Sequence, residues 1–118
     1  FSGGQRQRIC IARALSVDPS FIIFDESVSA LDVSIQLNML QLIDELKNSQ
    51  QFTSIFISHD LSVVHYISNR IMVMHQGKIV ETGTADEIIY NPKMAYTQQL
   101  IDAIPGKNLS KQQYFHNP

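Results

Sequence analysis

The sequence predicts an α/β protein with a mostly parallel sheet, flanking helices and a C-terminal β-hairpin. Short apolar runs at 21–24 and 52–58 flank a long amphipathic segment at 33–47, and a strand–helix–strand unit of this length favours a right-handed parallel crossover. The run at 21–24 is apolar at every position, which is typical of a strand buried on both faces. The pair Gln76-Gly77 separates two further strand-like runs and predicts a hairpin turn.

The first element is a predicted helix at about 3–17. Ser2 is a suitable N-cap, and Pro19 ends the helix because the residue before a proline disfavours the α region. Apolar residues recur at helical spacing, namely Ile9, Ala12 and Leu15. The same helix carries three positive charges, on Arg6, Arg8 and Arg13.

The second predicted helix, at 33–47, has Asp32 placed to cap it and an apolar stripe. The stripe consists of Ile35, Met39, Leu42, Ile43 and Leu46. After the second strand we expect a short helix at 61–67, hairpin strands at 70–75 and 78–82, and a final helix at 95–103. Between the hairpin and that helix, Thr84 and Glu87 match a capping box for a short helix that ends at Asn91-Pro92.

Composition excludes several classes of protein. The 118 residues suit one small globular domain, with 44% hydrophobic and 17% charged residues. Nine basic against eleven acidic residues give a net charge of −2, which does not favour nucleic acid or anionic lipid. The single cysteine, Cys10, excludes an internal disulfide and a cysteine-rich metal or cluster site. No apolar run approaches the roughly 20 residues that span a bilayer.

The first helix begins with a motif that suits phosphate. Its residues Ser2, Gly3, Gly4 and Gln5 present unpaired N–H groups, the positive end of a helix dipole and a hydroxyl. Taken alone, such a motif is more often an ordinary helix N-cap.

Acidic and imidazole side chains follow the two predicted parallel strands. Asp25 and Glu26 end the first strand, where Asp25 is a candidate Mg²⁺ ligand and Glu26 a candidate base for an attacking water. His59 ends the second and is a candidate hydrogen-bond partner for a terminal phosphate. Taken singly, an acidic pair at a strand end is more often part of a solvated turn. A lone histidine at the position of His59 is more often structural, and Asp32 is more often a helix cap.

In combination these motifs closely resemble the second half of an ATP-binding cassette (ABC) ATPase. The segments 2–8, 21–26, 29–32 and 58–60 match in order and spacing the signature motif, the Walker B strand with its catalytic glutamate, the D-loop and the switch histidine. The resemblance implies a partial P-loop NTPase fold that binds ATP and Mg²⁺. It implies Glu26 and His59 as catalytic residues and Asp25 as the metal ligand.

The resemblance also implies that the site is shared between two cassettes in a head-to-tail dimer. Asp25, Glu26 and His59 would serve the nucleotide of their own subunit. The signature residues Ser2, Gly3, Gly4 and Gln5 would contact the γ-phosphate held by the partner cassette, and Asp32 would couple the two sites.

Within the family, several details resemble the oligopeptide and dipeptide importers. These are Phe1, the segment 28–36, and the stretches 91–97 and 103–105. We therefore expect residues 1–90 to form the C-terminal part of the nucleotide-binding domain and 91–118 the start of a C-terminal extension with a polar tail. Ser27 and the stretch 93–95 depart from the family, which usually has a proline in each place, and the lack of C-terminal cysteines does not support a cluster.

The 118 residues contain no Gly-x-x-x-x-Gly-Lys-Ser/Thr phosphate loop. We therefore expect a C-terminal fragment that is inactive alone. The resemblance implies integral membrane permease subunits as partners, an extracytoplasmic peptide-binding protein as an indirect partner, no nucleic acid, and a peripheral place on the cytoplasmic face of the membrane. Two alternatives remain: a non-transport ABC ATPase, which the tight motif spacing disfavours, and an inert truncated gene product.

Overall fold

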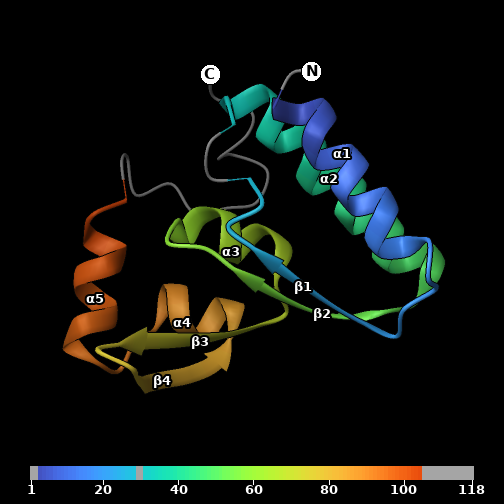
Figure 1. Cartoon of the computed structure of the whole chain (residues 1–118). Coiled ribbons are helices and arrows are strands. Elements are labelled where there is room, and N and C mark those ends of the chain that lie inside the picture. Colours follow the sequence, from blue (N-terminus) through green and yellow to red (C-terminus); the bar gives the residue numbers. More distant parts are fainter. Residues whose placement is uncertain (1–2, 29–30, 105–118) are drawn as a thin grey trace. The chain divides into compact units, whose positions relative to one another are not determined.

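The computed structural model describes residues 3–28 and 31–104 (Figure 1). The chain divides into two compact units, Phe1–His59 and Asp60–Pro118. Each unit contains one two-stranded sheet together with helices, parallel in the first unit and antiparallel in the second. The predicted α/β class is therefore confirmed.

The first unit contains α1 (Gly3–Leu15), β1 (Phe21–Asp25), α2 (Val33–Gln50) and β2 (Thr53–Ile57). Strands β1 and β2 pair in parallel with Phe21 opposite Thr53 and Asp25 opposite Ile57, which confirms the predicted crossover. Helix α2 is longer than predicted. It ends where Gln51 adopts a left-handed conformation and donates its N–H to the Lys47 carbonyl.

The buried residues of the first unit lie on both helices, on β1 and in the segments next to the strands. Helix α2 buries Gln36, Met39, Leu40 and Ile43, one face at the spacing expected of an amphipathic helix. The ring of Phe24 in β1 lies near those of Phe52 and Phe56, with ring centroids 6.3 and 6.0 Å away.

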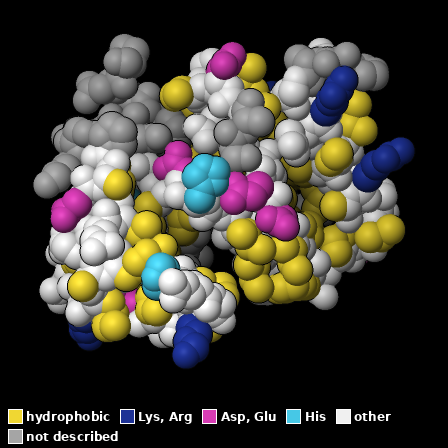
Figure 2. All heavy atoms as spheres, turned by 60° about the vertical axis from the view of Figure 1, so that its left-hand side comes forward, with side chains coloured by type: hydrophobic (Ala, Val, Ile, Leu, Met, Phe, Trp, Pro, Cys, Tyr) yellow, Lys and Arg dark blue, Asp and Glu magenta, His cyan; other side chains and the backbone are white. Residues whose placement is uncertain are grey.

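The expectation that β1 is buried on both faces is wrong. Its burial alternates, so that Ile22 and Phe24 are buried while Phe21 and Ile23 are exposed. On β2, Ile55 opposite Ile23 and Ile57 opposite Asp25 are also exposed. The physical reason is that no element among the described residues of this unit covers the second face of the sheet. Hydrophobic side chains therefore reach the molecular surface in patches (Figure 2).

The second unit contains α3 (Leu61–Ile67), β3 (Arg70–His75), β4 (Lys78–Thr84), α4 (Ala85–Tyr90) and α5 (Ala95–Asp102). Strands β3 and β4 form the predicted antiparallel hairpin. Its two turn residues, Gln76 and Gly77, have φ values of 51° and 77°, which is the backbone that a two-residue type I′ turn requires.

Side-chain caps fix the starts of two helices in this unit. The predicted capping box is confirmed: the Glu87 N–H donates to the Thr84 hydroxyl at 3.1 Å, and the Thr84 N–H donates to the Glu87 carboxylate at 3.0 Å. Helix α3 has the predicted bounds. Its cap is the Asp60 carboxylate, which accepts from the Ser62 N–H at 3.0 Å and the Val63 N–H at 3.4 Å.

The apolar residues of the second unit form two adjoining clusters. One joins Ile71 and Val73 of β3 to Ala85 and Ile88 of α4, and the other joins residues of α4 and α5, namely Ile89, Ile101 and Ile104. Leu61 of α3 packs against both clusters. Across 3–28 and 31–104, no helix is both long and apolar enough to cross a membrane.

A carboxylate on β4 holds the start of α5. Glu81 accepts hydrogen bonds from the Lys93 N–H at 2.8 Å and the Met94 N–H at 3.1 Å, and Met94 is the N-cap residue of α5. Partial burial alone would raise the pKa of the Glu81 carboxyl, but these backbone donors, together with the Thr97 side chain and the Lys93 charge, outweigh burial and hold the pKa below its ordinary value.

We predict that Glu81→Gln destabilises the protein at neutral pH by on the order of 1 kcal/mol, as the loss of a helix cap does. A carboxyl with a lowered folded-state pKa contributes stability above its unfolded-state pKa, and that contribution disappears as pH falls through the folded-state value. Urea unfolding at a series of pH values should therefore show the difference between variant and wild type shrinking in acid. Glu45→Gln, at an exposed position of α2, is the control, and a gap of constant size at every pH would contradict the prediction.

Candidate functional site

The carboxyl ends of β1 and β2 bring two of the predicted site residues together. Glu26 directly follows β1, and His59 lies two residues beyond β2. The His59 Nδ1 atom is 3.2 Å from Oε2 and 3.3 Å from Oε1 of Glu26. The side chains are 79% and 40% exposed for His59 and Glu26 respectively, so the pair is open to a ligand.

The backbone of Glu26 is unusual. Its φ is 54°, in the left-handed region, and its N–H donates to the Ile57 carbonyl at 2.9 Å. That hydrogen bond extends the β1–β2 ladder by one residue, after which the chain turns sharply. A non-glycine residue in this region costs about 1–2 kcal/mol and is characteristic of functional sites. Sequence reasoning missed this conformation, and no local motif indicates it.

Asp25, the predicted metal ligand, is the last residue of β1 and is exposed. In the part of the chain that the structure describes, no group of three or more His, Cys, Asp or Glu side chains could hold a metal ion. Mg²⁺ at phosphate-transfer sites uses one or two carboxylates together with phosphate oxygens and water. A single exposed carboxylate at a strand end fits that requirement.

The signature residues lie at the start of α1. Gly3 begins the helix, Gly4 is buried and Gln5 is exposed, whereas Ser2 falls outside the described residues. Side chains just before and within the first turn of α2 lie close to Gly3 and Gly4: a Cβ added to Gly3 would lie 3.0 Å from Cδ2 of Leu31, and one added to Gly4 would lie 2.8 Å from Cγ2 of Ile35.

Asp32 occupies the N-cap position of α2, but its side chain makes no capping hydrogen bond. Its backbone carbonyl instead accepts the Gln36 N–H at 2.7 Å. The capping role expected for the Asp32 carboxylate is therefore wrong, because the backbone alone closes the first turn. The carboxylate is exposed. The neighbouring motif residues Ser29 and Ala30 lie outside the described residues.

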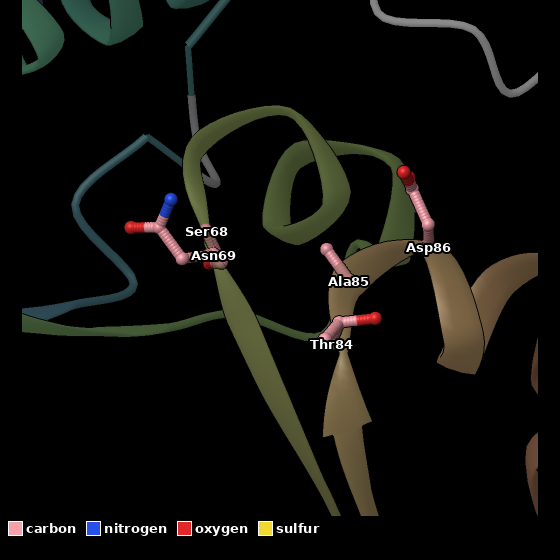
Figure 3. Close-up of a pocket in the computed structure, with 5 residues that line it drawn as sticks. All are labelled: Ser68, Asn69, Thr84, Ala85 and Asp86. Carbon is pink, nitrogen blue, oxygen red and sulfur yellow. The ribbon is translucent and has the colours of Figure 1, made fainter.

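Two hollows lie on the surface of the described residues. One, of about 300 Å³, lies between α1 and α2 and is lined by Gly4, Gln5, Arg8, Ile35, Asn38 and Met39. The other, of about 190 Å³, is lined by Ser68, Asn69, Thr84, Ala85 and Asp86 (Figure 3).

The polar groups around the second hollow already serve the fold. The Asn69 carbonyl accepts the Ala85 N–H at 3.0 Å, and Thr84 belongs to the capping box. The Asp86 carboxylate lies 3.1 Å from Nε2 of the buried His65. We therefore assign this hollow a structural role.

The chain is similar in sequence to known proteins over most of its length. The family described as ABC transporter matches residues 1–29. The oligopeptide transport ATP-binding protein OppF of Streptococcus mutans is 61% identical over 105 residues, which are 89% of this chain and 34% of that protein. The dipeptide transport ATP-binding protein DppF of Escherichia coli is 53% identical over 108 residues, 92% of this chain and 32% of that protein.

A solved structure supports the fold. A metal-chelate type ABC transporter in an inward-facing conformation superposes with a TM-score of 0.70 and 36% sequence identity, over 75% of this chain and 35% of that chain. By these comparisons the chain resembles ATP-binding components of the ABC transporter family. Within that family it resembles the oligopeptide and dipeptide transport proteins, and it spans about a third of the length of the curated relatives it matches.

Proposed function

We propose that this chain is part of the ATP-hydrolysing subunit of a transporter that imports peptides. The observation that carries the proposal is the contact between Glu26 and His59 at the carboxyl edge of the parallel strands, where α/β proteins bind their ligands. The names of the relatives support the peptide branch, because they transport oligopeptides and dipeptides.

Glu26 and His59 divide the chemistry between them. The Glu26 carboxylate orients a water molecule and accepts its proton as the water attacks the γ-phosphorus of ATP; the bond from that phosphorus to the bridging oxygen breaks, and ADP leaves. His59 contacts Glu26 through Nδ1, and its Nε2 would donate to a γ-phosphate oxygen, where negative charge develops. The 3.2 Å contact with Glu26 uses Nδ1 of His59, so Nε2 is the ring nitrogen that would face the phosphate.

The remaining site residues hold the nucleotides. Asp25 would contribute a carboxylate to Mg²⁺, which neutralises phosphate charge when bound. Gly3, Gly4 and Gln5, together with Ser2, would contact the γ-phosphate held by a second cassette in a head-to-tail dimer, and Asp32 would couple the two sites. The nucleotide-binding domain would then comprise residues 1–90, with a C-terminal extension at 91–118.

The same proposal implies partners on a membrane. The subunit would bind integral membrane permease subunits on the cytoplasmic face and receive peptides indirectly from an extracytoplasmic binding protein. Co-purification of the whole subunit with an integral membrane permease supports this role. A whole subunit that co-purifies with no integral membrane protein would instead favour a non-transport ABC ATPase.

An ATPase assay provides the direct test. We expect the 118 residues alone to show no turnover, because they contain no phosphate loop. The whole subunit should hydrolyse ATP. An inactive whole subunit would contradict the proposed function, and turnover by the 118 residues that disappears in Glu26→Gln would contradict the need for an upstream phosphate loop.

A further inference from the structure

The start of α1 approaches the start of α2 unusually closely. Gly4 is buried, and a Cβ added to it would lie 2.8 Å from Cγ2 of Ile35. Real Cβ atoms do not approach other heavy atoms so closely, so alanine at position 4 would force one of the two helices to shift. A Cβ at Gly3 would lie 3.0 Å from Cδ2 of Leu31.

The two methyl groups differ in how easily they can move away from an added Cβ. The Leu31 Cδ2 methyl is at the end of a rotatable side chain and can move aside. The Ile35 Cγ2 methyl is attached directly to Cβ in the first turn of a helix, where a β-branched side chain has one strongly preferred rotamer. The contact between Gly4 and Ile35 is therefore the stricter of the two.

The turn of α2 that meets Gly4 is itself tied to the segment after β1. The Gln36 N–H donates to the Asp32 carbonyl at 2.7 Å. The buried Gln36 side chain also donates to the Val28 carbonyl, at 3.5 Å. Ile35 lies between Asp32 and Gln36 in sequence. It therefore belongs to a helical turn that the Gln36 side chain connects to the segment after β1.

We propose that Ile35 is a positioning residue of the ATPase site. Its Cγ2 methyl against Gly4 seats the start of α1 on the first turn of α2. The backbone N–H groups near Gly3 and Gly4 and the Asp32 carboxylate consequently keep a fixed spacing toward a bound nucleotide. This inference rests on the proposed function, since it assigns the buried glycine a task within the same site.

The test distinguishes two reasons for a glycine at position 4. Either a Cβ there would collide with Ile35, or it would keep the backbone from approaching the nucleotide. In the whole subunit, Gly4→Ala should lower kcat about tenfold, an effect of the size that overpacking produces. Ile35→Leu removes the Cγ2 branch at nearly constant volume, and the double variant Gly4→Ala with Ile35→Leu should recover kcat to within about threefold of wild type. Ile35→Val keeps Cγ2 and should give no recovery.

All rates are compared well below the unfolding temperature of every variant, so that the folded fraction is the same. Gly83→Ala is the matched control, because its added Cβ would also meet an atom at 2.8 Å, but that atom is Oε2 of Glu87 in the capping box of the second unit and not Ile35. Ile35→Leu should not change the effect of Gly83→Ala on stability.

Three results would overturn the inference while the wild-type subunit remains active. They are an unaffected kcat in Gly4→Ala, equal recovery by Ile35→Leu and Ile35→Val, and recovery of thermal stability without recovery of kcat. The last result would leave Ile35 a packing residue only. An inactive wild-type subunit, by contrast, would reject the proposed function itself.

Discussion

Replacing Glu26 with glutamine is expected to lower ATP turnover by the whole subunit about 10²- to 10⁴-fold, the range attributed to a general base. The amide does not accept a proton from the attacking water at neutral pH. It nevertheless preserves the size of the side chain and the backbone hydrogen bond from position 26 to the Ile57 carbonyl. Steady-state kcat at saturating ATP measures the loss, and equilibrium titration with a nucleotide should show unchanged binding.

Glu45→Gln is the control, since it removes one carboxylate from an exposed position of α2. Its kcat should equal that of wild type. A Glu26→Gln subunit that retains more than about a tenth of wild-type turnover would show that another group accepts the proton. Loss of nucleotide binding together with turnover would instead indicate that Glu26 holds the ligand.

Sequence patterns predicted the elements that are determined by residues close together in the chain. The bounds of α3, the turn at Gln76-Gly77 and the capping box at Thr84 depend on residues within four positions of one another. Propensity, turn chemistry and caps act over that range. The pairing of β1 with β2 was also predictable, because an amphipathic helix between two short apolar runs favours a parallel crossover.

Features set by distant residues were missed. The exposure of Ile23 and Ile55 depends on what covers the second face of the sheet, which a local apolar run does not reveal. The Glu81 carboxylate and the start of α5 are 12 to 13 residues apart, and neither belongs to a short motif. Gly4 meets Ile35 only because two helices pack together.

The proximity of two candidate-site residues was easier to predict than the packing around them. The proximity of Glu26 and His59 follows from topology, since the carboxyl ends of two parallel strands lie at the same sheet edge. The left-handed backbone of Glu26 did not follow, because the Ile57 carbonyl that fixes it lies on the other strand. Topology therefore predicts which residues meet, while tertiary contacts determine how each one is oriented.

Replacing His59 with alanine is the second change with a large expected effect, a loss of about 10²- to 10³-fold in kcat, as when one donor to a developing negative charge is removed. The substitution also deletes the hydrogen-bond partner 3.2 Å from Glu26. Because the His59 side chain is 79% exposed, its removal should leave stability nearly unchanged. Single-turnover hydrolysis and thermal unfolding, measured on the same preparation, separate the two effects.

His75→Ala is the matched control, because His75 stacks on Tyr96 at a centroid distance of 3.9 Å within the second unit and should not affect turnover. The double variant of Glu26→Gln with His59→Ala tests whether the contact is functional. Residues that act as one unit give strongly non-additive losses, so the double variant should be little slower than Glu26→Gln alone. Losses that multiply would mean that the two side chains act on the phosphate independently, in spite of their contact.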